Sequence, residues 1–238
     1  MKLWVTLSIL GLAGVFSLLL SPQLFEAIPK EVMNEFSPKY IPFLVLINPI
    51  VLTLIFTLVG VKTYHSGGYE LNIIEPLIKF EKPKDASIYA LLKNGIFFGI
   101  ISGLVVLLFQ FMMSPMLPNE LMNGREPHLI TKIIYGGFTE ELIARFGVMS
   151  LLTWLLIKWR HSKSDVTYWM AIIISALLFA LGHLPFASEI TNGLSFEITI
   201  YILIGNLLPG IIFGLLYWKN GLESAMLAHM VFHLITLI

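Results

Sequence analysis

The residues best suited to chemistry lie inside an otherwise apolar stretch of the chain. Residues 136–145 read Gly-Gly-Phe-Thr-Glu-Glu-Leu-Ile-Ala-Arg, and a mostly apolar run follows them. An ionisable side chain at the centre of a bilayer costs about 2.5–3.5 kcal/mol, so such residues are paired, line water or do chemistry. Glu141 and Arg145 are four residues apart and can form an ion pair on one helix face. Glu140 lies about 100° around the helix from Glu141 and has no such local partner.

Two further apolar stretches carry histidines. His183 ends the sequence Phe-Ala-Leu-Gly-His, and His229 and His233 are four residues apart in the C-terminal run. A carboxylate without a cation of its own, beside an imidazole, is a plausible base for activating water. Further imidazole N–H groups could stabilise the oxyanion that forms when water attacks an amide. The same groups could instead bind zinc, although the HExxH pattern of standard zinc proteases is absent.

Other roles account for part of this pattern. Glu141 and Arg145 could form a buried ionic clamp, and the C-terminal histidines could be hydrogen-bonding groups between helices. Neither role explains Glu140. A proton-coupled transporter would also use Glu and His, but the chain is small and lacks the internal repeat that many transporter folds carry.

The composition predicts the elements that must position these residues. Hydrophobic residues make up 57% of the chain and charged residues 13%, whereas a soluble domain carries roughly 25% charged residues. Because a spanning helix needs about 20 mostly apolar residues, we predict an all-α, polytopic transmembrane helical bundle of about seven spans. These are residues 3–20, 41–61, 88–113, 129–157, 166–182, 196–218 and 222–238.

Two segments need separate interpretation. The first apolar run is longer than the core of a secretory signal and no A-x-A-like site follows it, so we interpret it as an uncleaved helix. Residues 62–87 form the longest polar segment. We expect an interfacial loop there, with a short amphipathic helix around residues 71–80.

Charges predict an orientation and exclude some functions. If seven spans alternate, nine basic residues fall on one side, Lys2, Lys62, Lys79, Lys82, Lys84, Lys158, Arg160, Lys163 and Lys219, and three on the other, Lys30, Lys39 and Arg125. The positive-inside rule then places the N-terminus in the cytoplasm. A rise of 1.5 Å per residue puts Glu140 and the membrane histidines in the half of the membrane away from the basic loops.

The composition also excludes some functions. Basic and acidic residues number 15 each, which gives no basic field for nucleic acid. The absence of cysteine excludes disulfides and thiolate catalysis.

These motifs resemble those of the CPBP family, which includes the Rce1-type CAAX prenyl endopeptidases and the bacterial Abi proteins. That family is identified by EExxxR, FxxxH and HxxxN on successive membrane helices. Residues 140–145 match the first motif and residues 179–183 the second. His229 begins the third motif, whose last position is His233 instead of Asn.

The resemblance implies a glutamate-dependent intramembrane endopeptidase that acts on a membrane-associated protein or peptide. It implies residues 129–238 as the catalytic helical core and residues 1–128 as N-terminal transmembrane helices and interfacial loops. The implied site has a water-activating pair, an oxyanion hole and a supporting pair: Glu140 with His183, His229 with His233, and Glu141 with Arg145. No cofactor is implied, and zinc stays open as an alternative.

Location and biological role are further expectations from the resemblance. It implies an integral multi-pass protein in the lipid bilayer of a bacterial cell membrane. Processing of prenylated proteins requires a site open to the cytosol, whereas the charge distribution puts this site nearer the outer face. Bacteriocin immunity or the handling of peptide signals, to which bacterial members are linked, fits an outward-facing site. The alternative is a non-catalytic scaffold or immunity protein of the same family.

Overall fold

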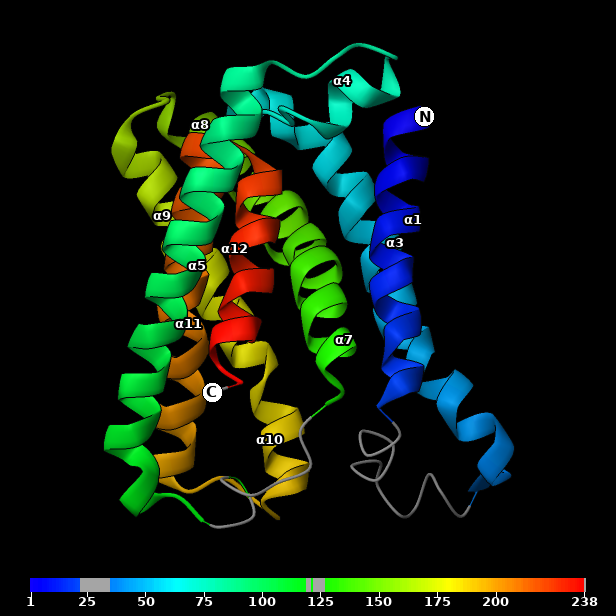
Figure 1. Cartoon of the computed structure of the whole chain (residues 1–238), viewed down its shortest axis with the longest axis vertical. Helices are drawn as coiled ribbons and strands as arrows, with labels where there is room; N and C mark the ends of the chain where they lie inside the picture. Colours follow the sequence, from blue (N-terminus) through cyan, green and yellow to red (C-terminus); the bar gives the residue numbers. More distant parts are fainter. Residues whose placement is uncertain (22–34, 119–120, 122–126, 238) are drawn as a thin grey trace.

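The protein is a bundle of antiparallel helices in its computed structural model, which describes residues 1–21, 35–118, 121 and 127–237 (Figure 1). Within those residues all regular secondary structure is helical. The helices in chain order are α1 (Lys2–Ser17), η1 (Leu18–Leu20), η3 (Pro38–Tyr40), α3 (Ile41–Gly67), α4 (Ile74–Ile78), α5 (Asp85–Met113), η4 (Ser114–Met116), α7 (Leu129–Thr131), η5 (Lys132–Glu140), η6 (Leu142–Met149), α8 (Ser150–Arg160), α9 (Asp165–Gly182), α10 (Leu184–Ile190), α11 (Phe196–Asn220) and α12 (Leu222–Ile235).

Six helical stretches among the described residues are long and apolar enough to cross a membrane. They are Lys2–Leu20, Ile41–Gly67, Asp85–Met116, Leu129–Arg160, Asp165–Ile190 and Phe196–Asn220. The predicted seventh span forms α12, which has 14 residues. At 1.5 Å per residue such a helix is about 21 Å long, less than the roughly 30 Å of the hydrocarbon core. The prediction of about seven spans is therefore close, and the chain is an integral membrane protein.

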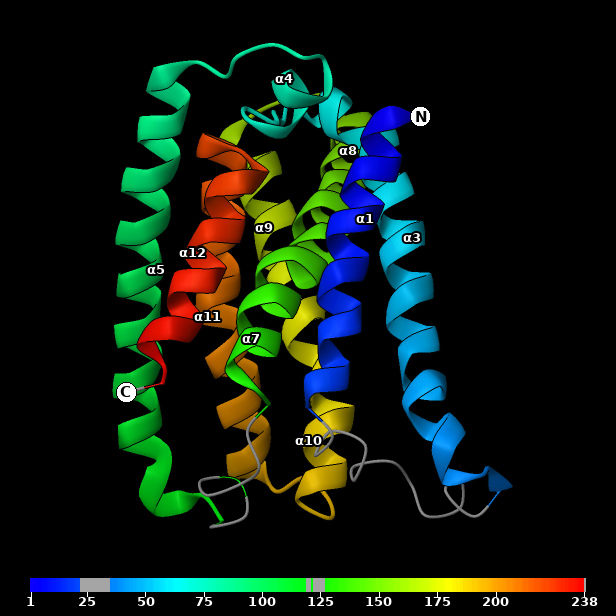
Figure 2. The ribbon, with the colours of Figure 1, turned by 45° about the vertical axis from the view of Figure 1, so that its right-hand side comes forward.

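The helix that carries the Glu-Glu motif lies at the centre of the bundle. This continuous helix, made of α7, η5, η6 and α8, packs against α1, α3, α9, α11 and α12, and Figure 2 shows it between α12 on one side and α1 on the other. The N-terminal run that we interpreted as a helix, α1, packs along η5 and α3. The buried side chains of this central helix form the core with residues of α11 and α12.

The sequence predicted an ordinary α-helix here, but most of the central helix is a π-helix. Both η5 and η6 are π-helical, separated only at Glu141. A π-helix closes i→i+5 hydrogen bonds, is rare beyond single turns, and occurs frequently at functional sites. Side chains five residues apart therefore lie about one turn apart on this helix. Apolar periodicity cannot reveal this change in a helix that is apolar on nearly all sides.

The short helix α12 is held against α5 by a close backbone approach. Gly95, Gly99 and Gly103 of α5 face α12, and a Cβ added at Gly99 would lie 2.7 Å from the carbonyl oxygen of Ala228. Small residues allow this approach between membrane helices. The face of α12 that carries its histidines is thereby directed toward η5.

The two ends of the bundle differ in charge. The start of α1, the end of α3, α4, the start of α5, the α8–α9 connection and the end of α11 lie together at the top of Figure 1. We call this the basic end, because it carries the nine basic residues predicted to share one side. The expected short helix in the loop is α4. Of the three basic residues predicted for the opposite end, Lys39 is described, whereas Lys30 and Arg125 lie outside the described residues.

Candidate active site

The structure brings the charged residues of the three motifs together. Glu140 ends η5, His183 follows the last residue of α9, and His229 lies on α12. The Glu140 carboxylate lies 3.9 Å from His183 Nε2 and 3.6 Å from His229 Nε2. Three elements that are distant in sequence therefore converge on one carboxylate.

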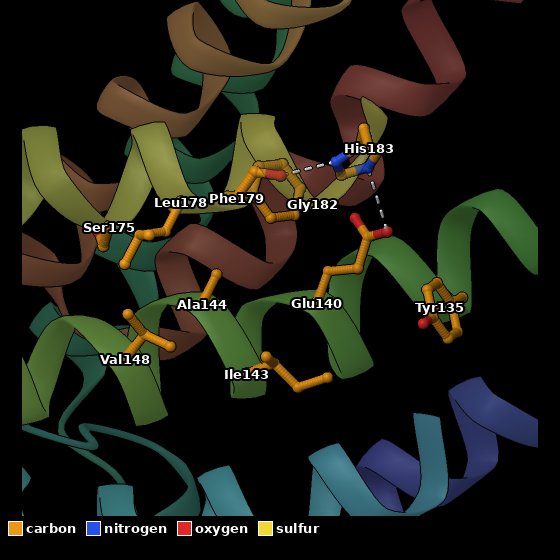
Figure 3. A pocket seen from close by; sticks show the side chains of 10 residues that line it. All are labelled: Tyr135, Glu140, Ile143, Ala144, Val148, Ser175, Leu178, Phe179, Gly182 and His183. Carbon is orange, nitrogen blue, oxygen red and sulfur yellow. Dashed lines mark hydrogen bonds and ion pairs between the residues drawn. The ribbon is translucent and has the colours of Figure 1, made fainter. Parts of the chain in front are cut away.

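Glu140 and His183 form the accessible part of this cluster (Figure 3). The Glu140 side chain is 19% exposed and that of His183 is 34% exposed. His183 Nδ1 donates a hydrogen bond of 2.8 Å to the carbonyl oxygen of Phe179, because a carbonyl can only accept. In a neutral imidazole this leaves Nε2, the atom facing Glu140, free to accept a proton.

Glu141, Arg145 and His229 form the enclosed part, with exposures of 0%, 1% and 4%. Glu141 Oε1 accepts a 2.8 Å hydrogen bond from His229 Nδ1 and lies 3.3 Å from Arg145 Nη1. Arg145 Nη2 also donates to the carbonyl oxygen of Gly210 at 3.1 Å. The ion pair predicted from the i,i+4 spacing is thus present, and it extends to α11 and α12.

Aromatic rings enclose this buried ion pair. The Arg145 guanidinium lies 4.8 Å from the centre of the Phe179 ring and 5.5 Å from that of Phe213. Phe213 also stacks on the His229 ring, with centroids 4.7 Å apart. Cation–π contacts of this kind strengthen when they are desolvated. Phe179, the first residue of the second motif, therefore contributes both a ring to Arg145 and a carbonyl to His183.

His233 lies beside His229 and does not pair directly with a carboxylate. The two rings stack with centroids 4.9 Å apart, and within the described residues His233 forms no ion pair with Glu140 or Glu141. A Cβ added at Gly136 would lie 2.6 Å from His233 Nε2 and 3.0 Å from His229 Nε2. Both Nε2 atoms therefore point at the same part of η5, one turn before Glu140.

An apolar groove of about 280 Å³ ends at Glu140 and His183. It runs between the central helix and α9, and Figure 3 shows Tyr135, Glu140 and His183 at one end, with Val148 and Ser175 at the other. Its walls are apolar or small, and include Ile143, Ala144, Leu178, Phe179 and Gly182. The groove can hold an extended apolar segment with one end at the carboxylate.

A larger cavity, of about 510 Å³, lies at the basic end, away from the motifs. Its Glu75 forms an ion pair of 2.8 Å with Lys79. The hydrogen bond from Lys79 holds the pKa of the Glu75 carboxyl below its ordinary value, and the same bond raises the pKa of Lys79. These groups already satisfy one another, so we take the groove at Glu140 as the candidate active site.

The His and Glu side chains at this site can be examined as possible ligands of a metal ion. Within the described part of the chain, no group of three His, Asp or Glu side chains is arranged to hold a metal ion. The Nδ1 atoms of His183 and His229 are engaged in hydrogen bonds, which leaves the Nε2 atom of each ring facing Glu140. Zinc stays an alternative for experiment to decide, and we derive no step through a metal.

Sequence reasoning did not identify three contributors to the site. Tyr135 lines the groove, Gly136 makes room for the imidazoles, and Gly210 supplies a carbonyl to Arg145. Gly136 was visible in the sequence as part of a Gly-Gly pair that is separated from the motif by two residues. The alignment of Tyr135 with Glu140 depends on the π-helical turn, for which the sequence carries no recognised signal.

A comparison with models of known protein families agrees with the motifs. Residues 126–235 match the family model described as type II CAAX prenyl endopeptidase Rce1-like. The match covers all six site residues predicted from the sequence. It supports the kind of function that CAAX-type intramembrane proteases have. No curated protein and no solved structure gives a match to this chain.

Proposed function

We propose that this protein is an intramembrane endopeptidase that hydrolyses a peptide bond in a membrane-associated protein or peptide. One observation carries the proposal: the Glu140 carboxylate lies between two imidazole nitrogens, 3.9 and 3.6 Å away, at the end of an apolar groove. The Rce1-like match of residues 126–235 supports the same reaction class.

In the proposed reaction, Glu140 and His183 activate the water. The 3.9 Å between their facing atoms is too long for a direct hydrogen bond, but one water can bridge it with two bonds of about 2.8 Å. The water oxygen adds to the scissile carbonyl carbon while its proton passes to this pair. When the C–N bond breaks, the pair returns the proton to the leaving amine.

His229 and His233 stabilise the oxyanion in this proposal. Because His229 Nδ1 donates to Glu141, Nε2 of His229 is a donor only when the ring is protonated. The proposal therefore requires both ring nitrogens of His229 to carry a proton when the oxyanion forms. His233, stacked on His229, supplies a second N–H in place of the asparagine amide.

Glu141 and Arg145 support the site without touching the substrate. Glu141 fixes the ring of His229 through Nδ1, and Arg145 anchors Glu141 to the carbonyl of Gly210 on α11. Such hydrogen-bonded partners determine which nitrogen of a histidine carries the proton. This arrangement accounts for two adjacent glutamates with different tasks.

The test is cleavage of a peptide pool by purified protein in detergent or nanodiscs. The pool contains farnesylated peptides with a CAAX ending and other lipid-anchored peptides, and mass spectrometry identifies broken peptide bonds. We expect wild type to cleave members of the pool and Glu140→Gln and His183→Ala to cleave none, while both variants insert and accumulate. Absence of cleavage by wild type would contradict the proposal and favour the non-catalytic scaffold or immunity role.

A chelator separates the glutamate mechanism from a metal-dependent one. Cleavage that is unaffected by chelation, and lost in Glu140→Gln, supports the glutamate mechanism. Cleavage lost on chelation and restored by added zinc would overturn it, because the metal would then supply the activated water.

A further inference from the structure

Tyr135 is a polar residue of the groove that the proposed reaction does not use. It lies on η5 five residues before Glu140, which is about one π-helical turn, and it lines the groove together with Glu140 and His183. Figure 3 shows it beside Glu140, at the His183 end of the groove. Its phenol is therefore close to the place where the scissile peptide bond would lie.

The ring of Tyr135 is held by packing on its other side. It contacts the cluster formed by Val15, Leu18 and Leu46, which belong to α1, η1 and α3. Three elements thus fix the ring against η5. A side chain held in this way can present its hydroxyl group at low entropic cost, because little conformational freedom is lost on binding.

The hydroxyl of Tyr135 has no hydrogen-bond partner among the described residues. The hydroxyl groups of four other tyrosines packed among the helices each have a hydrogen-bond partner. The pairs are Tyr64 with Glu75, Tyr69 with Thr153, Tyr168 with the carbonyl of Gly67, and Tyr217 with Ser150. A tyrosine hydroxyl that is packed in this way ordinarily finds a partner. Tyr135 differs from the other four in that it faces the groove at Glu140.

We propose that the Tyr135 hydroxyl donates a hydrogen bond to a backbone carbonyl of the substrate, next to the scissile bond. An extended peptide within the membrane exposes carbonyls that no helix satisfies, and each one left unpaired is costly. Ser175, the other hydroxyl residue that lines the groove, already donates to the carbonyl oxygen of Ile172. This inference rests on the proposed endopeptidase function. It means that the groove binds the peptide backbone of the substrate as well as an apolar group.

The test compares Tyr135→Phe with wild type, because phenylalanine keeps the ring and removes only the donor. On the pool of farnesylated and lipid-anchored peptides described above, we expect kcat/KM to fall about 3- to 10-fold, the value of one neutral hydrogen bond. In the inactive Glu140→Gln background, the Kd of the cleaved peptides should rise by a similar factor. The melting temperature should not change, since the packing of the ring is retained.

Tyr89→Phe is the matched control, because Tyr89 is an exposed tyrosine near the start of α5, at the basic end. It should leave both kcat/KM and Kd unchanged. Unchanged kcat/KM and Kd in Tyr135→Phe, with an active wild type, would overturn this inference alone. A loss that accompanies a lower melting temperature would also overturn it, because Tyr135 would then be structural. A wild type that cleaves no peptide would remove the proposed function and this inference with it.

Discussion

At the scale of single residues, the neighbouring carboxylates Glu140 and Glu141 have different surroundings. Glu140 faces the groove and two imidazoles at 3.6–3.9 Å, whereas Glu141 is fully buried, accepts a hydrogen bond from His229 and forms an ion pair with Arg145. Solvent access and free space favour chemistry at Glu140. Burial and direct bonds favour a supporting role for Glu141, so substitutions in this region should separate loss of activity from loss of stability.

Arg145→Ala should destabilise the protein strongly. Arg145 is buried, pairs with Glu141 and donates to Gly210, and its removal leaves the buried Glu141 carboxylate uncompensated. Breaking a buried ion pair on one side costs about 3–5 kcal/mol, which a thermal unfolding scan in detergent would detect. Lys79→Ala, which breaks the exposed pair with Glu75, is the control and should barely change the melting temperature. Equal melting temperatures for the two variants would contradict the buried clamp.

The departure from the family pattern at position 233 gives a second residue-scale prediction. If His233 supplies an N–H to the oxyanion, His233→Ala should lower kcat by about 100- to 1,000-fold, the usual cost of removing one such donor. His233→Asn, which restores an amide donor, should stay within about tenfold of wild type, since only the geometry of one hydrogen bond changes. Steady-state kinetics on the peptide pool measures both. Comparable activity in His233→Ala and wild type would show that this ring has no role in the reaction.

The sequence predicted the members of the site better than their contacts. Glu140, Glu141, Arg145, His183 and His229 could be selected because charge inside an apolar span is costly, and the structure brings these five together. The pairing of Glu141 with His229, across 88 residues of chain, could not be predicted, because helix neighbours are not visible in one sequence. The catalytic roles of these residues remain proposals.

At the scale of elements, the π-helix sets the face that the motif presents. Between Lys132 and Met149 the central helix is π-helical except at Glu141, so its turn is wider than the α-helix that the sequence predicted. Hydropathy identified this helix by its length and apolar character, and these two properties do not depend on whether the helix is an α-helix or a π-helix. It could not distinguish i→i+4 from i→i+5 bonding, and therefore missed the alignment of Tyr135 with Glu140.

Gly136→Ala tests the contact between η5 and α12. The added methyl group would lie 2.6 Å from His233 Nε2 and 3.0 Å from His229 Nε2, so the His233 ring would have to shift and the His229 ring would be crowded. A displacement of about 1 Å can cost about 100-fold in rate, and we expect a loss of that order in kcat. Gly205→Ala in α11 is the matched control, because a Cβ there meets nothing within 4 Å. A Gly136→Ala variant as active as Gly205→Ala would contradict the close approach.

The C-terminal element shows another limit of the sequence. The apolar run 222–238 was predicted to span the membrane, but α12 ends at Ile235 and is shorter than the hydrocarbon core. A hydropathy window counts apolar residues whether they face lipid or protein. The α12 residues from Leu222 to Met226 are buried, and Gly99 of α5 approaches its backbone, so much of its apolar surface serves packing.

At the scale of the whole molecule, the two ends of the bundle have different chemistry. The basic end holds the nine predicted basic residues and also the five tryptophans, Trp4, Trp154, Trp159, Trp169 and Trp218, which lie near the ends of α1, α8, α9 and α11. Tryptophan is typical of membrane–water interfaces, and an excess of Lys and Arg is typical of cytoplasmic loops. Glu140 and His183 lie in the other half of the bundle, because Glu140 is nearer to Leu129 than to Arg160 and His183 follows the end of α9.

Cysteine labelling in intact cells tests this orientation, and the chain is suited to it because it contains no cysteine. Lys163→Cys places a single thiol in the α8–α9 connection at the basic end, and Leu194→Cys places one between α10 and α11 at the opposite end. Both positions are exposed. If the basic end is cytoplasmic, a membrane-impermeant maleimide should label Leu194→Cys in intact cells and Lys163→Cys only after permeabilisation. The reverse pattern would open the groove toward the cytosol, where prenylated proteins are processed, and would shift the expected substrate from external peptides to that class.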